Sequence, residues 1–235
     1  NVTGVQTCAL PISLFGDQVT VADKVSGVST ATTGLIAYRG VVVGDRQLTW
    51  MDRSGTAQGT LGDADGSLLN PNLAPDGRRA VVSRTVQGNM DLWIIDDVRT
   101  SRFTFDPAAD RVPLCSPDGT RIVFQSARTG GGDIYQKSTG GIAVEERLVG
   151  SDAAKTTTGW SANGRFVLFH YFEAQTSGDV WVLPMQGDHT PFVFLKTPFK
   201  EVRAMFSPDS RWIAYHSDES GRDEIYVRPF VPSGH

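Results

Sequence analysis

The sequence predicts an all-β protein, a β-propeller in which four-stranded blades repeat along the chain. Three observations predict this fold. A turn of the Pro-Asp-Gly type recurs every 42 to 46 residues, and an apolar run follows each turn. In each repeat an acidic residue lies 15 or 16 residues after the aspartate or asparagine of the turn, and an aromatic residue lies two positions after that acid. Repeats of this length, made of short strands and tight turns, are typical of propeller blades.

The first element of each repeat is the turn. Proline presets φ at about −65°, aspartate can bond its own backbone, and glycine accepts the left-handed conformation that closes the turn. In the third repeat an Ala-Asn pair replaces Pro-Asp, and in the fourth a serine, Ser210, replaces glycine. The turn residues are Pro75, Asp76 and Gly77; Pro117, Asp118 and Gly119; Asn163 and Gly164; and Pro208 and Asp209.

A strand follows each turn. These runs lack the alternation of polar and apolar residues, which indicates strands covered on both faces, as in stacked blades. They are residues 79–82, 121–124, 166–169 and 212–215.

The next strand of each repeat begins with an acid and an aromatic residue. The simplest interpretation of the acid is structural, because a carboxylate there can accept hydrogen bonds from the neighbouring turn. The alternative is a ring of acids that binds a ligand. The pairs are Asp91 and Trp93, Asp133 and Tyr135, Asp179 and Trp181, and Glu224 and Tyr226.

The repeats predict a single partial propeller domain over residues 14–235, with about five blade equivalents. A ring of six or seven blades needs roughly 270 to 315 residues, so we expect an incomplete fragment, completed by missing blades or domains of a parent protein. Residues 1–13 resemble a translated sequencing adapter, and we expect an artefactual leader outside the fold. The blades are expected near 27–62, 71–109, 112–151, 157–198 and 202–230.

Composition and motifs exclude several functions. The net charge of −4 is spread without a basic stripe, so no nucleic-acid partner is predicted, and no apolar run is long enough to insert in a membrane. The nucleophile elbow, the phosphate-binding loop, the H-E-x-x-H motif and the kinase motifs are absent. We therefore predict no catalytic residue, no cofactor and no metal, with Cys115 as a small buried hydrophobe.

Loops at one rim are the expected binding surface, because propellers place recognition on loops. His170 and His216 end equivalent strands, and with Asp218 nearby they form an alternative metal or ligand spot. Each of four loops joins the first identified strand of a repeat to the second. Three connections between successive blades are expected at the same rim. The loops are Arg84–Met90, Ser126–Gly132, Tyr171–Gly178 and Ser217–Arg222, and the connections lie near 106–111, 151–156 and 197–203.

The Ser-Pro-Asp-Gly and Asp-Ile-Tyr motifs at this spacing resemble the TolB-like, Pro-Asp-type (PD40) relatives of the WD repeat, over Gly34 to Pro232. Segments 47–55, 102–107 and 223–230 are similar to the propeller that follows the kinase domain in many bacterial eukaryotic-like serine/threonine kinases. The resemblance implies a non-catalytic sensory or scaffolding module in the periplasm, and it transfers no catalytic residue.

Three functions follow from these observations. The preferred hypothesis is a module that binds a protein, peptide or small ligand through its rim loops. The alternative is the gating propeller of a prolyl-oligopeptidase-like serine hydrolase, whose catalytic domain lies elsewhere. A third is a propeller enzyme with a central metal.

Overall fold

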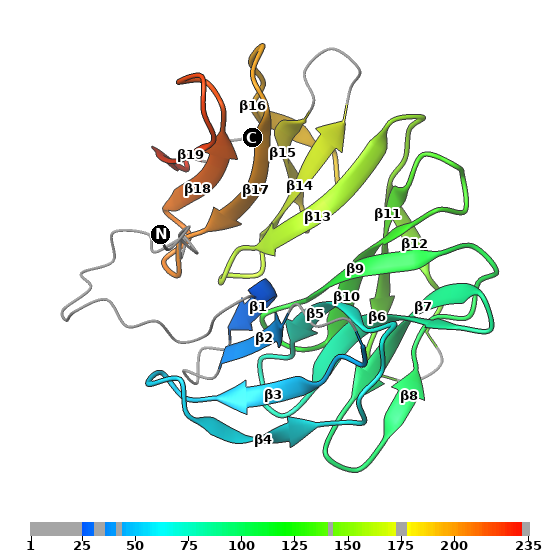
Figure 1. Cartoon of the computed structure of the whole chain (residues 1–235). Coiled ribbons are helices and arrows are strands. Elements are labelled where there is room, and N and C mark those ends of the chain that lie inside the picture. The colour runs from blue at the N-terminus through cyan, green and yellow to red at the C-terminus, as the bar shows by residue number, and fades with distance from the viewer. Residues whose placement is uncertain (1–24, 31–35, 41–43, 141–142, 173–177, 232–235) are drawn as a thin grey trace. The chain divides into compact units, whose positions relative to one another are not determined.

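The repeated turns and strands form an all-β structure, which we describe from a computed structural model (Figure 1). The structure describes residues 25–30, 36–40, 44–140, 143–172 and 178–231, the first two ranges by strand pairing alone. Within these ranges there are nineteen strands and no helix. They are β1 Val25–Thr30, β2 Ile36–Gly40, β3 Leu48–Met51, β4 Ala57–Leu61, β5 Leu69–Leu73, β6 Ala80–Val86, β7 Asn89–Ile95, β8 Thr100–Arg102, β9 Asp110–Cys115, β10 Arg121–Ser126, β11 Asp133–Ser138, β12 Glu146–Val149, β13 Ala154–Trp160, β14 Phe166–Phe172, β15 Asp179–Pro184, β16 Phe192–Leu195, β17 Glu201–Phe206, β18 Trp212–Ser217 and β19 Glu224–Pro229.

The strands form five antiparallel sheets in which neighbours in sequence are neighbours in space. Sheet 1 has the order β1-β2-β3-β4, sheet 2 β5-β6-β7-β8, sheet 3 β12-β11-β10-β9 and sheet 4 β13-β14-β15-β16. Sheet 5 contains β17-β18-β19, three strands among the described residues. Successive four-stranded meanders of this kind are propeller blades, so the predicted fold class is confirmed.

The chain divides into two compact units, residues 1–115 and 116–235. In the first unit, the core lies between sheets 1 and 2, and β9 packs on β5 and β6. Two hydrogen bonds fix β9 there: the Val112 N–H donates to Ser83 Oγ at 3.2 Å, and the Cys115 N–H donates to Asn72 Oδ1 at 2.8 Å. The core residues are Leu48, Leu61, Leu68, Leu73, Ala80, Val82 and Ile95.

In the second unit, the largest core lies between sheets 4 and 5. Leu168, Val180 and Val182 of sheet 4 pack with Ala204 and Tyr215 of sheet 5. Aromatic rings close the end of this core, and Phe230 meets Phe166 edge-on with ring centroids 5.2 Å apart. Phe194 and Phe206 complete this aromatic group.

The strands that follow the turns are covered on both faces, as predicted, in β6, β10 and β14. Val81 and Val82 point to opposite faces of sheet 2, and both are buried, as are Val123 and Phe124 in sheet 3. In β18 the prediction fails at one residue. Trp212, the first residue of β18, is 43% exposed.

The predicted leader, residues 1–13, lies outside the described residues, as does part of the predicted loop Tyr171–Gly178. In the portion of the chain that is described, no helix has the length and apolar character needed to cross a membrane.

Candidate functional site

The four turns share one hydrogen-bonded geometry. In the first, the Gly77 N–H donates to the Ala74 carbonyl at 3.0 Å, and Gly77 has a φ of +67°. Asp76 Oδ1 accepts the Arg78 N–H at 2.9 Å. Equivalent bonds occur at Asp118, Asn163 and Asp209. Pro75, Pro117 and Pro208 take the second turn position and Gly119 and Gly164 the fourth, so these residues are part of the scaffold.

A serine strengthens three of the turns. The hydroxyl of Ser116 donates to Asp118 Oδ1 at 2.5 Å and accepts the Arg121 N–H at 2.9 Å. The Ser116 hydroxyl and the backbone of Thr120 lower the pKa of Asp118 to about 2. The turn acid is therefore ionised and held by the turn itself, which leaves it little capacity for a ligand.

The second-strand acids lie at the opposite end of their sheets from these turns. The strands there end in the loops β6–β7, β10–β11 and β18–β19 and the connections β8–β9, β12–β13 and β16–β17. We call this end of each sheet the loop rim.

In the first unit, Asp91 is buried at the loop rim and forms an ion pair. Its Oδ2 lies 2.6 Å from the guanidinium of Arg102, from the neighbouring strand β8. It also accepts the side-chain N–H of Asn89 at 3.1 Å. Asn89 in turn bonds the carbonyl of Asp106 at 2.8 Å, which fixes the connection that follows β8.

In the second unit, Asp133 is the centre of a buried network. Lys155 Nζ lies 2.9 Å from Asp133 Oδ1, and both side chains are fully buried. Arg147 approaches the second carboxylate oxygen at 2.6 Å, and the Ser151 N–H donates to Oδ1 at 3.1 Å. The hydroxyl of Thr129 donates to Oδ2, the oxygen that Arg147 approaches. Burial alone would raise the pKa of Asp133, but the hydrogen bonds from Thr129 and Lys155 outweigh it and lower the pKa.

Lys155 joins sheet 4 to sheet 3. Its ammonium also donates to the carbonyls of Ser151 and Ala153, at 3.0 and 2.7 Å. Its backbone N–H donates to the Gly132 carbonyl at 3.2 Å. With three acceptors and no exposure, this lysine is a structural cation and not an accessible base.

The equivalent junction between sheets 4 and 5 has the opposite charge pattern. Glu201 takes the place of Lys155, and its backbone N–H donates to the Gly178 carbonyl at 2.9 Å. Asp179 is buried at the place of Asp133 and pairs with Lys196 at 3.6 Å. Glu201 accepts hydrogen bonds from the hydroxyl and N–H of Thr197. Burial, and then the charge of Asp179, raise the pKa of Glu201.

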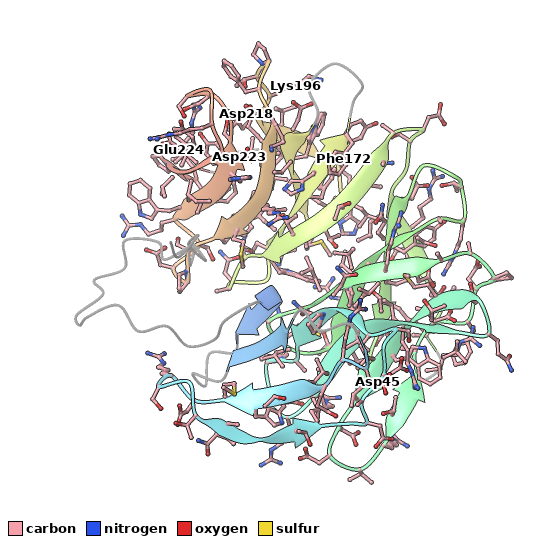
Figure 2. All side chains as sticks on the ribbon, in the orientation of Figure 1. Asp45, Phe172, Lys196, Asp218, Asp223 and Glu224 are labelled. Atoms are coloured by element: carbon pink, nitrogen blue, oxygen red, sulfur yellow. The ribbon has the colours of Figure 1, made fainter. Side chains whose placement is uncertain are left out.

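The fourth acid, Glu224, is partly exposed and bonds within its own hairpin. It accepts from Arg222 at 2.8 Å and from the Tyr226 hydroxyl at 3.2 Å. Figure 2 shows Glu224 near Asp218 and Asp223 of the same hairpin. Asp218 accepts the backbone N–H of Lys200 at 2.9 Å, and Asp223 pairs with the Lys200 ammonium at 2.8 Å. These acids connect the hairpin to the segment before β17.

The predicted spot of His170, His216 and Asp218 does not form a ligand set. His170 is buried between sheets 4 and 5, and its Nε2 accepts the Ala204 N–H at 3.2 Å. Burial, with the nearby Arg203, lowers the pKa of His170 to about 3. His216 is half-buried on sheet 5, 3.8 Å from Asp223. Across the described ranges, no group of three metal-binding side chains is placed to hold an ion.

The second-strand aromatics stack on neighbouring side chains. The Tyr135 ring lies against Phe124 at 6.1 Å and under the Arg128 guanidinium at 4.6 Å. Trp181 packs on Tyr171, and Tyr226 stacks on Tyr215. In the first unit, the Arg84 guanidinium lies 4.9 Å from the Trp93 ring. The repeated aromatic is therefore a packing residue in each sheet.

Sequence reasoning missed the first-strand residues at the loop rim. Asp110, Lys155 and Glu201 are all fully buried, five residues before Cys115, Trp160 and Phe206 respectively. The signal was present, because three charged residues recur at one repeat position. It was missed because charged residues are rarely buried unless they are paired.

The first predicted rim loop is much shorter than expected. β6 extends to Val86 and β7 begins at Asn89, so Arg84–Met90 contains a two-residue turn. Gln87 and Gly88 have φ values of +52° and +84°, which suits the twist of a hairpin. Exposed phenylalanines lie elsewhere on the rim: Phe105 in the first unit, and Phe172 and Phe199 in the second.

Comparison with known proteins identifies the family. Residues 29–188 match the family described as PD40: TolB beta propeller domain, which is more than half of the chain. The chain belongs to this TolB β-propeller family. The predicted resemblance to TolB-like propellers is confirmed.

Solved structures share the TolB-like fold at low identity. TolB from Acinetobacter baumannii has a TM-score of 0.76 and 21% identity, over 88% of this chain and 52% of that protein. A protein assigned as TolB from Agrobacterium tumefaciens has a TM-score of 0.71 and 14% identity, over 88% and 77%. Oligogalacturonate lyase in complex with manganese has a TM-score of 0.63 and 14% identity, over 92% and 68%. The chain thus spans about half of the A. baumannii TolB, and these likenesses concern the fold.

Proposed function

We propose that this TolB-like propeller is a non-catalytic interaction module that binds a protein or peptide through its loop rim. The observation that carries the proposal is a difference between the charged and the aromatic side chains of that rim. The repeated charged groups bond within the fold, whereas the loops beside them expose large aromatic side chains. Exposed aromatics are enriched where proteins bind one another.

Each of the two units exposes large aromatic side chains at its loop rim. In the first unit, Phe105 is 63% exposed and lies 5.1 Å from the Arg102 guanidinium. In the second, Phe172 and Phe199 are each about two-fifths exposed. Arginine and aromatic residues are both enriched in binding hot spots, and the attraction between a guanidinium and a ring strengthens when a partner excludes water.

The absence of a recognisable catalytic motif supports a binding role. Burial raises the pKa of the Cys115 thiol to about 12, so it is a neutral thiol at pH 7 and a poor nucleophile. His170 is buried as a hydrogen-bond acceptor, which leaves it unsuited to proton transfer with a substrate.

A random peptide library displayed on phage tests the proposal. Peptides are selected on the full chain, and their affinities are measured for two rim variants, Phe105→Ser and Phe199→Ser. We expect one or both variants to weaken binding by roughly 30-fold, since truncating a hot-spot residue costs about 2 kcal/mol.

Val98→Ser is the matched control. Val98 is 91% exposed on the β7–β8 turn, at the other end of its sheet, so its truncation should leave binding unchanged. Peptides that depend on Val98 and ignore both phenylalanines would overturn the rim assignment.

We further propose that the module belongs to a larger signalling protein of the bacterial serine/threonine kinase type and functions in the periplasm. The family resemblance of segments 47–55, 102–107 and 223–230 supports this context. The complete reading frame tests it. A kinase domain and a membrane anchor upstream would support the proposal, whereas a serine hydrolase domain downstream would favour a gating propeller.

A further inference from the structure

The third repeat turn contains the only Asn-Gly pair of the sequence, Asn163-Gly164. An asparagine that precedes glycine loses its side-chain amide most readily, because glycine has no side chain to hinder its backbone nitrogen. Asn163 is also exposed to water at the turn. The equivalent positions of the other repeats hold Asp76, Asp118 and Asp209. Conversion of this asparagine to aspartate would therefore produce the residue that the repeat otherwise has.

The turn of Asn163 matches the turn of Asp118 bond for bond. Asn163 Oδ1 accepts the Ser161 hydroxyl at 2.8 Å and the Arg165 N–H at 3.0 Å. The corresponding bonds to Asp118 Oδ1 measure 2.5 and 3.0 Å. In both turns the glycine N–H donates to the serine carbonyl at 2.9 Å. The turn of Asp118 thus shows the hydrogen bonds that an aspartate would form in the third repeat.

Deamidation is a covalent modification that needs the two groups held by these bonds. The backbone nitrogen of Gly164 attacks Cγ of Asn163, so an N–Cγ bond forms and the Cγ–Nδ2 bond breaks. The proton of the Gly164 N–H leaves with the amide nitrogen as ammonia. Water then opens the cyclic imide, and cleavage of the new N–Cγ bond gives aspartate. Cleavage on the other side of the nitrogen, at the main-chain carbonyl carbon of Asn163, gives isoaspartate.

The closed turn ties down both reacting groups. The Gly164 N–H is engaged by the Ser161 carbonyl, and Asn163 Oδ1 is held by two donors. The same serine hydroxyl accepts the Phe166 N–H at 2.9 Å, so the side-chain bond is linked to the first residue of β14. The nitrogen can attack only when the turn opens locally, and the rate then follows the population of the open turn.

We propose that Asn163 is a deamidation site that the closed turn protects, and that conversion to aspartate leaves the turn more stable than before. A charged carboxylate accepts stronger hydrogen bonds than an amide oxygen. At Asp118 and Asp209, the serine hydroxyl and then a backbone N–H lower the pKa of the acid, to about 2 for Asp118. Such stabilisation is complete above the ordinary pKa of 3.8 and is lost as the pH falls toward 2, so neutral pH retains all of it.

Incubation of the full chain at mildly alkaline pH, folded and in concentrated urea, tests the protection. Mass spectrometry of peptides follows Asn163 together with Asn72 and Asn89, which leucine and methionine follow in the sequence. In urea, Asn163 should convert faster than the other two. In the folded chain it should convert at least about tenfold more slowly than in urea, because only the open turn reacts. Equal rates for Asn163 in both conditions would overturn the protection.

A pair of opposite substitutions tests the stabilisation. Asn163→Asp should raise the melting temperature at neutral pH by about 2 to 4 °C, the shift expected from one strengthened set of hydrogen bonds. Asp118→Asn is the matched control, because it makes an Asn-Gly pair in a turn with the same bonds. It should lower the melting temperature by a similar amount, and the fraction that converts to aspartate should melt as the unmodified chain does.

Two further results would overturn the proposal. One is faster conversion of Asn72 or Asn89 than of Asn163 in urea, and the other is an unchanged or lower melting temperature for Asn163→Asp. The turns lie at the opposite end of the sheets from the loop rim, so failure here leaves the proposed function standing.

Discussion

Sheets 4 and 5 have nearly the same pattern of residues and yet have different environments. The run from Phe166 to His170 matches the run from Trp212 to His216 position by position. One run is buried by the next sheet, and the other is partly exposed. The comparison shows that the repeat specifies strands and turns, whereas burial depends on which neighbour is present.

The junctions at the loop rim differ in a second way. Between sheets 3 and 4, a buried lysine neutralises the acid of the preceding sheet, at 2.9 Å from Lys155 to Asp133. Between sheets 4 and 5, Glu201 is in that position and its charge opposes Asp179. The same repeat position thus holds a lysine that pairs with the buried acid at one junction and an acid at the next.

The largest expected effect distinguishes the two apolar faces. Val182→Lys places an unpaired ammonium in a fully buried site and should cost about 4 kcal/mol or more of unfolding free energy. Val227→Lys, on the face of sheet 5 that carries Val227 and Ile225, should cost less than about 0.5 kcal/mol. Urea denaturation of both variants measures the difference. Equal losses would mean that this face of sheet 5 is covered in solution.

The two junctions should respond oppositely to removal of the first-strand charge. Lys155→Met leaves Asp133 buried with one cation fewer and should cost about 3 kcal/mol. Glu201→Gln removes a carboxyl whose pKa is raised in the fold, so at pH 7 it should leave stability unchanged or increase it. A loss of similar size in both variants would contradict the charge pattern.

The burial of His170 between sheets 4 and 5 should make the unfolding free energy depend on pH in acid. The pKa of His170 falls from 6.5 to about 3 in the fold, so the unfolded state binds the proton first. Its contribution to stability is complete above pH 6.5 and is lost as the pH falls toward 3. His170→Gln should flatten the wild-type decline in this range, by up to about 1.4 kcal/mol per pH unit.

The smallest effect concerns the turns of the same two sheets. Gly164 has a φ of +74° and Ser210 one of +57°. Ser210 Oγ accepts the Ala162 N–H at 3.0 Å, which offsets its left-handed strain. Gly164→Ser should therefore cost about 1 kcal/mol, and Ser210→Gly should change the melting temperature little. A marked stabilisation by Ser210→Gly would show that the hydroxyl bond contributes nothing.

The sequence predicted the fold because turn chemistry and strand burial are local and repeat four times. Pro75, Asp76 and Gly77 each act within a few residues of their own position. The rim was harder to predict, since Asp133 and Lys155 meet across two sheets and 22 residues of chain. His170 was misplaced for the same reason. Its neighbour Ala204 comes from the next sheet, which strand patterns alone do not position.

Oxidation of methionine by hydrogen peroxide tests the central claim most directly, because the chain contains one exposed and one buried methionine that can be compared in the same sample. Met205, on the same face of sheet 5 as Val227, is 52% exposed, and Met185, which directly follows β15 of sheet 4, is 4% exposed. Mass spectrometry of the native chain should show Met205 oxidised at least about tenfold faster than Met185, in line with exposure. Equal, slow oxidation of both would contradict the account, since this face of sheet 5 would then be covered.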